Sequence, residues 1–258
     1  MFNSLGTHFT SPSSLRRWRI LTGLVMWIYM AAHMLNHSLG LISLRVAEAG
    51  IKLAILLIHS WPVSLLLYGA FGLHLCLAII GIARRPSLRM PWLEYLRIAL
   101  GLGFPLMLIG HVFATRLSHE WFNLAPEYGR VVASLIASGN EGRQLALLAP
   151  GWAHGCLGLY LSIQRIKSQP WMRPFFIGFC VALPVLAGAG FLAMEREVTQ
   201  LLGDAHWRQS ALTRLTPSDA AWFQGRRSLV IDLYLGAVLA TFALRGAMIW
   251  WTNRTRQH

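Results

Sequence analysis

Four histidines stand in the first four of six apolar segments: His33, His74, His111 and His154. An ionisable side chain at bilayer depth is costly, so each of them predicts a functional role. Neutral imidazole is a common metal ligand, and haem iron takes axial ligands from histidine. Four inward-facing imidazoles on four helices are what two bis-histidine haems need. The sequence therefore predicts two haem b groups with these four residues as iron ligands.

The depth of each histidine predicts how the four combine. At a rise of about 1.5 Å per residue, His33 and His111 lie about 20 and 22 Å above the inner ends of their helices. On the same scale, His74 lies about 12 Å and His154 about 18 Å above the inner end. We therefore expect an outer pair of His33 with His111 and an inner pair of His74 with His154, which together would form an electron path through the bilayer.

Other residues are candidates for supporting roles. His37 follows His33 by four residues on the same helix face, and it is interpreted as a hydrogen-bonded core residue, a quinone contact or an alternative haem ligand. Four arginines could contact haem propionates or could be plain interfacial anchors: Arg116, Arg143, Arg84 and Arg85. Small residues near the histidines could leave room for a flat macrocycle: Gly69, Gly72, Gly110, Gly155 and Gly158.

The composition predicts an all-α membrane protein. Of 258 residues, 55% are hydrophobic and only 13% are charged, about half the charged fraction of a soluble domain. Apolar runs of about 20 residues span a bilayer as helices. The expected spans are Ile20–Ser43, Pro62–Ala83, Tyr95–Arg116, Gln144–Gln164, Pro174–Met194 and Leu229–Trp251. They form one six-helix bundle over residues 20–251, with a four-helix dihaem core at 20–166 and short end segments at 1–19 and 252–258.

The segments between the spans differ in character. Ala47–Ser60 is amphipathic, which predicts a helix at the outer surface. A short helix is expected near Tyr128–Ala137, and the long polar stretch Glu195–Arg227 is expected to be partly helical.

The charged residues that give the net charge of +13 are distributed unequally between the two sides of the expected membrane. This distribution argues against a nucleic-acid partner. With the N-terminus inside, the inner face collects 13 bases against the single acid Glu94, whereas the outer loops carry 10 bases and 9 acids. This is the positive-inside distribution, so both termini are expected in the cytoplasm and the chain in a bacterial inner membrane. The first apolar run is too long for a cleavable signal peptide.

The strings around the four histidines resemble the dihaem cytochrome b membrane subunit of the fumarate reductase and succinate dehydrogenase superfamily. They are Gly23-Leu-Val-Met-Trp-Ile-Tyr-Met-Ala-Ala-His33-Met, Leu73-His74-Leu-Cys-Leu-Ala, Gly110-His111-Val-Phe and His154-Gly-Cys-Leu-Gly-Leu-Tyr160. The resemblance covers roughly residues 20–195 and implies haem pairs of His33 with His111 and His74 with His154. Trp152 is a departure, because some quinone-oxidising members place a carboxylate near that position.

A narrower resemblance is to the N-terminal membrane anchors of bacterial class III adenylate/guanylate cyclases. It is carried by Trp18-Arg-Ile-Leu-Thr-Gly, by His33-Met-Leu-Asn-His37-Ser-Leu-Gly-Leu-Ile-Ser43 and by Arg89-Met-Pro-Trp92. In that family the last helix leads into a [2Fe-2S] domain and then a cyclase. The sequence ends at His258, about where such a domain would start, so we expect a free-standing anchor, a separated subunit or part of a longer protein.

These observations predict a dihaem membrane cytochrome that exchanges electrons with quinone and serves as a redox-sensing anchor for a cytoplasmic cyclase or iron–sulfur partner. A homodimer is expected if the cyclase resemblance holds. One alternative is an electron-transfer anchor of a fumarate reductase-like or succinate dehydrogenase-like complex. Another is a haem-free receptor or transporter whose histidines carry protons or metal. The chain has no complete catalytic site of its own.

Overall fold

The computed structural model describes residues 12–163, 171–212 and 215–255, which form helices joined by short connections, with no strand among them. The main helices run α2 Pro12–Ser38, α3 Leu44–Ile58, α4 Trp61–Ala83, α5 Trp92–Val112, α7 Tyr128–Ser138, α8 Glu141–Ile163, α9 Met172–Leu201 and α11 Pro217–Thr255. Shorter pieces are the 3-10 turn η1 at Leu39–Leu41, the π-helix η2 at Phe113–Leu117, α6 at Ser118–Phe122 and α10 at Ala205–Ala211.

Six of the helices are long and apolar enough to cross a membrane, so the prediction of an all-α protein with six membrane spans agrees with the structure. They are Ser14–Leu41, Trp61–Ala83, Trp92–Phe122, Glu141–Ser162, Met172–Leu201 and Pro217–Thr255. The first helix begins before Ile20, inside the segment expected to precede the membrane domain. The last begins at Pro217, well before Leu229, so the stretch expected to be a partly helical loop contributes part of a 39-residue helix. Most of the predicted loop Arg165–Arg173 lies outside the described residues.

Local capping explains where several helices begin and end. The Ser43 hydroxyl accepts a hydrogen bond from the Val46 amide at 3.2 Å and begins α3. The Asp204 carboxylate does the same for Trp207 at the start of α10. α7 ends at Gly139, whose φ of 61° is the left-handed conformation that glycine adopts without strain. The amphipathic helix predicted at residues 47–60 is α3, and the short helix expected near residues 128–137 is α7.

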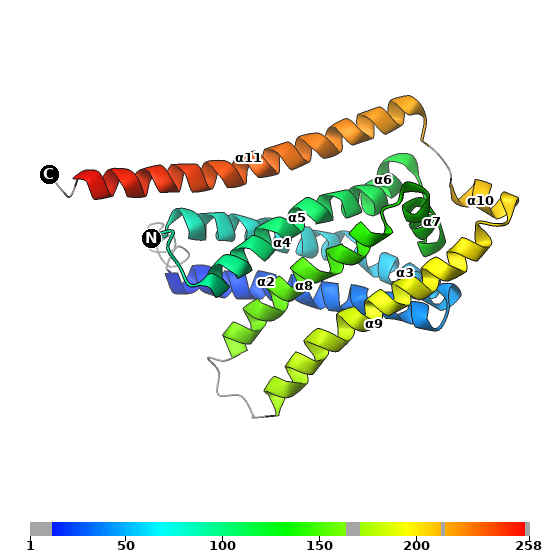
Figure 1. The fold of residues 1–258 in the computed structure, drawn as a ribbon, viewed down its shortest axis with the longest axis horizontal. Helices are drawn as coiled ribbons and strands as arrows, with labels where there is room; N and C mark the ends of the chain where they lie inside the picture. The colour runs from blue at the N-terminus through cyan, green and yellow to red at the C-terminus, as the bar shows by residue number, and fades with distance from the viewer. Residues whose placement is uncertain (1–11, 164–170, 213–214, 256–258) are drawn as a thin grey trace.

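The helices form an elongated bundle (Figure 1). The first turn of α2 and the last turn of α11 lie at one end, and α3, α6, α7 and α10 gather at the other. α2 packs against α4, α8 and α9, and α5 packs against α8. α11 runs along the outside of the bundle against α4 and α5 (Figure 1). α2, α4, α5 and α8 are the four helices that carry the four histidines.

Two apolar cores lie beside α9. One joins α3, α7 and α9 through Leu44, Val132, Phe191 and Met194. The other joins α2, α8 and α9 through Met34, Trp152 and Ala187, with Trp27 stacked on Trp152 at a centroid distance of 5.3 Å. A Cβ atom at Gly190 would overlap the carbonyl group of His37, so glycine is required where α9 crosses α2. α9 thereby holds the end of α2 that carries His33 and His37.

Candidate functional site

The structure brings the four histidines together as two pairs. The ring centroids of His33 and His111 are 5.9 Å apart with an interplanar angle of 71°. Those of His74 and His154 are 6.1 Å apart at 88°. Each pair reaches across the bundle, from α2 to α5 in the first case and from α4 to α8 in the second. These are the same combinations that the depths along the helices predict.

The separation of each pair suits one metal ion between two imidazoles. A metal–imidazole nitrogen bond is about 2 Å long, so two rings on opposite sides of one ion have centroids about 6 Å apart. Among the described residues, no group of three or more histidine, cysteine or acidic side chains could hold a metal ion. Each pair by itself offers two imidazoles, the donor set that an iron needs when its four equatorial ligands come from a porphyrin.

Three of the four imidazoles have a partner at Nδ1, which leaves Nε2 as the nitrogen available to a metal ion. His74 Nδ1 lies 3.1 Å from the Thr22 hydroxyl, and His154 Nδ1 lies 2.9 Å from the backbone oxygen of Arg97. His111 Nδ1 lies 3.2 Å from the Gln144 side-chain amide. Metal-ligating histidines commonly donate the second ring N–H to such a group, which fixes the tautomer and the ring orientation.

His33 is the exception, because its Nε2 lies 3.2 Å from Nε2 of His37. His37 is 5% exposed, packs against the Tyr128 ring at 5.2 Å and has a buried Nδ1 with no hydrogen-bond partner among the described residues. Tyr128 in turn accepts a hydrogen bond from the Asn36 amide at 2.8 Å. The structure therefore places His37 in direct contact with the His33–His111 pair, within a buried polar cluster that also contains Asn36 and Tyr128.

The glycines that face the imidazoles are not the ones adjacent to them in sequence. A Cβ atom at Gly69, Gly72 or Gly158 would meet nothing within 4 Å in the described part of the chain, and one at Gly155 would meet Trp27. The space at Gly69, Gly72 and Gly158 is thus open among the described residues, and the expectation that small residues leave room for a flat macrocycle stays a prediction. Gly23 and Gly101, on helices opposite the histidines, lie against the imidazoles themselves.

A Cβ atom at Gly23 would lie 3.3 Å from His74 Cε1, and one at Gly101 would lie 2.5 Å from His154 Cε1. Both members of the His74–His154 pair thus lie directly against the backbone of another helix. A Cβ at Gly101 would overlap the ring, so that position requires glycine, whereas a Cβ at Gly23 would make a tight contact. This close packing and the two-imidazole donor set fit a bis-histidine haem.

One of the predicted propionate contacts, Arg143, lies beside the residue that precedes His111, and a second, Arg116, is partly buried. The Arg143 guanidinium would be 2.5 Å from a Cβ at Gly110, the residue before His111. Arg116 pairs with Glu120 at 2.9 Å, yet its other terminal nitrogen is buried and has no hydrogen-bond partner within the described ranges. A buried guanidinium N–H without an acceptor is suited to a carboxylate ligand.

At the other end of the bundle the two predicted arginines differ in their surroundings. Arg84 is exposed, and Arg85 is engaged with Glu94 at 2.5 Å. Two further arginines belong to helices that contact this pair. Arg97 is the sixth residue of α5 and binds His154 through its backbone oxygen, and Arg19 is the eighth residue of α2, three residues before Thr22. Helical phase relative to the histidine on the partner helix could have identified them, but the sequence does not reveal which helices are partners.

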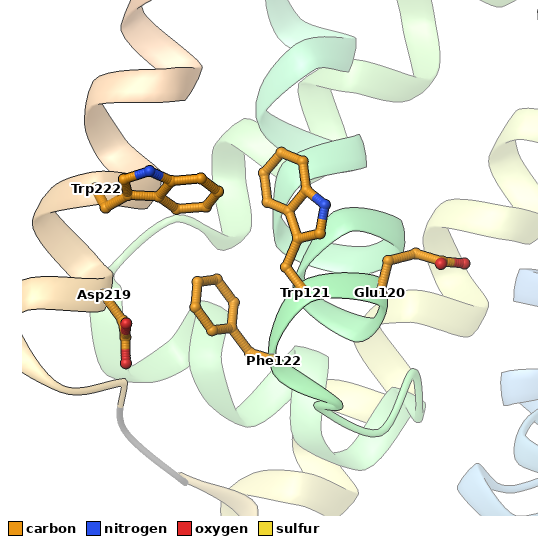
Figure 2. Close-up of a pocket in the computed structure, with 5 residues that line it drawn as sticks. All are labelled: Glu120, Trp121, Phe122, Asp219 and Trp222. Atoms are coloured by element: carbon orange, nitrogen blue, oxygen red, sulfur yellow. The ribbon is translucent and has the colours of Figure 1, made fainter.

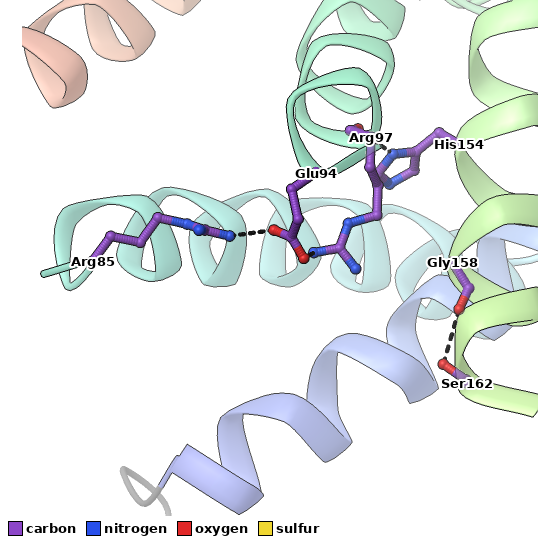
Figure 3. A network of polar contacts seen from close by, with 6 residues as sticks. All are labelled: Arg85, Glu94, Arg97, His154, Gly158 and Ser162. Atoms are coloured by element: carbon purple, nitrogen blue, oxygen red, sulfur yellow. Dashed lines mark hydrogen bonds and ion pairs between the residues drawn. The ribbon is translucent and has the colours of Figure 1, made fainter. Parts of the chain in front are cut away.

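We call the end of the bundle that carries Arg19, Arg85, Arg97 and Arg245 the arginine-rich end. Figure 3 shows part of its polar network, with Arg85, Glu94, Arg97 and His154. Glu94 pairs with Arg85 at 2.5 Å and with Arg97 at 3.1 Å. The backbone oxygen of Arg97 accepts from His154, and the backbone oxygen of Arg85 accepts from Arg245 Nε at 2.5 Å. The network joins α4, α5, α8 and α11.

At the opposite end, the amphipathic helix α3 carries a partly buried acid. Glu48 Oε1 accepts a hydrogen bond from the Gly129 amide at 2.8 Å, and Oε2 is buried without a partner among the residues that the structure describes. Burial raises the pKa of Glu48 above its ordinary value, although the hydrogen bond from Gly129 works against that shift. Burial likewise raises the pKa of Tyr128. The acid is thus held next to the cluster that contacts His37.

The same end has an open hollow of about 540 Å³ between α6 and α11, lined by Glu120, Trp121, Phe122, Asp219 and Trp222 (Figure 2). The Trp121 and Trp222 rings meet edge to face at 5.1 Å. Arg226 lies over the Trp222 ring at 5.4 Å. These aromatic contacts fasten the beginning of α11 to the bundle, away from both histidine pairs.

Comparison with known proteins gives no family: no family model, no curated protein and no solved structure matches this chain.

Proposed function

We propose that this chain is a membrane cytochrome holding two haem b groups, one between His33 and His111 and one between His74 and His154. The observation that carries the proposal is the presence of two imidazole pairs with centroids 5.9 and 6.1 Å apart. A proton relay or a packing role would not require this repeated spacing. When bound, haem supplies one-electron redox chemistry that the side chains themselves lack.

The roles of the other residues follow from their contacts. Thr22, the Arg97 carbonyl group and Gln144 orient the rings through Nδ1, while Gly23 and Gly101 keep the approach to His74 and His154 open. The arginines near each pair would neutralise propionates: Arg143 and Arg116 at one site, Arg19 and Arg97 at the other. A pair of sites at two depths is an arrangement for passing electrons across a bilayer.

We further propose that the electrons are exchanged with the quinone pool and that the chain reports or passes the redox state to a cytoplasmic partner. The partner would be a cyclase-like or iron–sulfur domain or subunit. The basic residues of the arginine-rich end favour the cytoplasmic side of a bacterial inner membrane for that end. α11 ends there and would be the connection to the partner (Figure 1).

A reduced-minus-oxidised optical spectrum of the purified protein, with pyridine haemochrome quantification, tests the proposal. We expect about two b-type haems per chain, reducible by a quinol. Absence of haem in protein made with ample haem supply would refute it.

A haem-free role has one observation in its favour, the contact between His33 and His37. Two imidazoles with Nε2 atoms 3.2 Å apart can share a proton. Under this alternative, purified protein would lack haem, and replacing His37 would abolish transport of protons or of a transition metal into proteoliposomes.

A further inference from the structure

Helix α11 is held to the bundle by few contacts. None of its described residues is buried, although it is 39 residues long. Beyond the aromatic contacts at its beginning, two hydrogen bonds tie it to the bundle within the described part of the chain. Tyr234 donates to the Leu102 carbonyl oxygen at 2.6 Å, and Arg245 donates to the Arg85 carbonyl oxygen at 2.5 Å. The position of the last part of α11 therefore depends strongly on Arg245.

The residue that anchors Arg245 belongs to the network of the His74–His154 pair. Arg85, directly after α4, uses its carbonyl oxygen for Arg245 and its guanidinium for Glu94. Glu94, in the first turn of α5, also binds Arg97, whose carbonyl oxygen accepts from His154. Figure 3 shows this chain from Arg85 through Glu94 and Arg97 to His154. An unbroken series of polar contacts thus joins an imidazole in the bundle to α11.

A change of charge at the His74–His154 pair would act on the guanidinium of Arg97. This guanidinium binds the Glu94 carboxylate at 3.1 Å, and the backbone oxygen of Arg97 lies 2.9 Å from His154 Nδ1. Negative charge added at the pair attracts Arg97 and competes with Glu94 for it, which changes the interaction of Glu94 with Arg85. The side chains of Arg85, Glu94 and Arg97 are 27%, 32% and 30% exposed, so they can rearrange without repacking an apolar core.

We propose that the contact chain Arg97–Glu94–Arg85–Arg245 couples the redox state of the His74–His154 site to the position of α11. Glu94 is the positioning residue at its centre. This proposal rests on the proposed function, because it requires a one-electron change at the histidine pair. The proposed regulation is that the end of α11 is held to α4 more firmly in one redox state of the site than in the other.

Hydrogen–deuterium exchange of peptides covering residues 246–255, in nanodisc-embedded protein with its haems, tests the coupling. In the unmodified protein, we expect a several-fold difference in exchange rate between the oxidised and the dithionite-reduced state. Glu94→Gln breaks the chain in its middle and Arg245→Gln at its end, so both should abolish that difference. Arg84→Gln is the control for Arg245→Gln, because it removes the same charge next to Arg85 without interrupting the chain, and it should retain the difference.

Haem content measured on the same samples separates the two proposals. Two haems with no redox-dependent difference in the unmodified protein, or a difference that persists in both Glu94→Gln and Arg245→Gln, would overturn the coupling and leave the cytochrome proposal standing. Protein without haem would overturn both. Loss of the redox-dependent difference in exchange rate in Arg84→Gln would also overturn the coupling, because a general charge effect would then be responsible.

Discussion

Gly101 on α5 lies so close to His154 on α8 that a Cβ atom there would be 2.5 Å from the Cε1 atom of the imidazole. No other residue type fits this position without moving the ring or the helix. The contact fixes where one member of the His74–His154 pair sits. It joins two helices that are strongly packed against each other, α5 and α8.

Gly101→Ala should therefore disturb the His154 site and cost about 1–3 kcal/mol of stability, because the added methyl group overlaps a packed ring. We expect loss or a spectral shift of one of the two haems, measured by optical spectroscopy and haem quantification. Gly103→Ala is the matched control on the same helix, since a Cβ at Gly103 would meet nothing within 4 Å among the described residues. Equal behaviour of the two variants would contradict the proposed role of Gly101.

The pairing itself is tested by double substitutions. His33→Ala with His111→Ala removes both ligands of one site and should leave about one haem per chain. His33→Ala with His74→Ala removes one ligand from each site and should leave none. Pyridine haemochrome assays measure both, with His206→Ala in the exposed helix α10 as the control. The same haem content in both double variants would show that the pairs are not the sites.

Thr22 should control the strength of ligation by His74. Its buried hydroxyl donates to the Trp18 carbonyl oxygen at 2.7 Å, which leaves a lone pair for the His74 Nδ1–H. Thr22→Val keeps the shape but removes the acceptor, and loss of such a partner weakens metal binding about 10–100-fold. Transfer of haem to apomyoglobin, followed optically, measures this.

Thr22→Ser provides the control for that experiment because it retains the hydroxyl group. It should hold haem as the unmodified protein does. If Thr22→Ser loses haem as fast as Thr22→Val, packing rather than the hydrogen bond is responsible.

Glu48 predicts a pH dependence of stability. Burial raises its pKa in the folded protein above the unfolded value, so folding favours the protonated form. The stabilisation by that proton is fully present below the unfolded pKa and is lost as the pH rises through the folded pKa. Glu48→Gln, which is neutral at every pH, should raise the thermal unfolding midpoint at pH 7 relative to unmodified protein. The gain should disappear once the pH falls below the unfolded pKa of a glutamate, about 4.3.

Glu127→Gln is the comparison for Glu48→Gln. Glu127 pairs with Lys52 at 3.4 Å at an exposed site, where ion pairs contribute little. Its replacement should leave the midpoint nearly unchanged at both pH values. A larger gain from Glu127→Gln than from Glu48→Gln at pH 7 would contradict the assignment to burial.

The sequence by itself determined the helical class and the six spans, because runs of about 20 apolar residues have few other structures open to them in a bilayer. It also indicated which histidines lie at a similar depth, because each residue of a helix adds the same rise along its axis. The amphipathic pattern at residues 47–60 likewise located α3, because a helix repeats every 3.6 residues.

Only the tertiary structure decided what surrounds each imidazole. Gly23, Gly101, Thr22 and Gln144 come from helices other than those of the rings they contact, and helix rotation and neighbour order are set by packing rather than by local pattern. The contact of Arg97 with His154, and the link from Glu94 through Arg85 to Arg245, arise in the same way. The glycines that lie against the imidazoles are not sequence neighbours of the histidines, because neighbouring residues on a helix are about 100° apart.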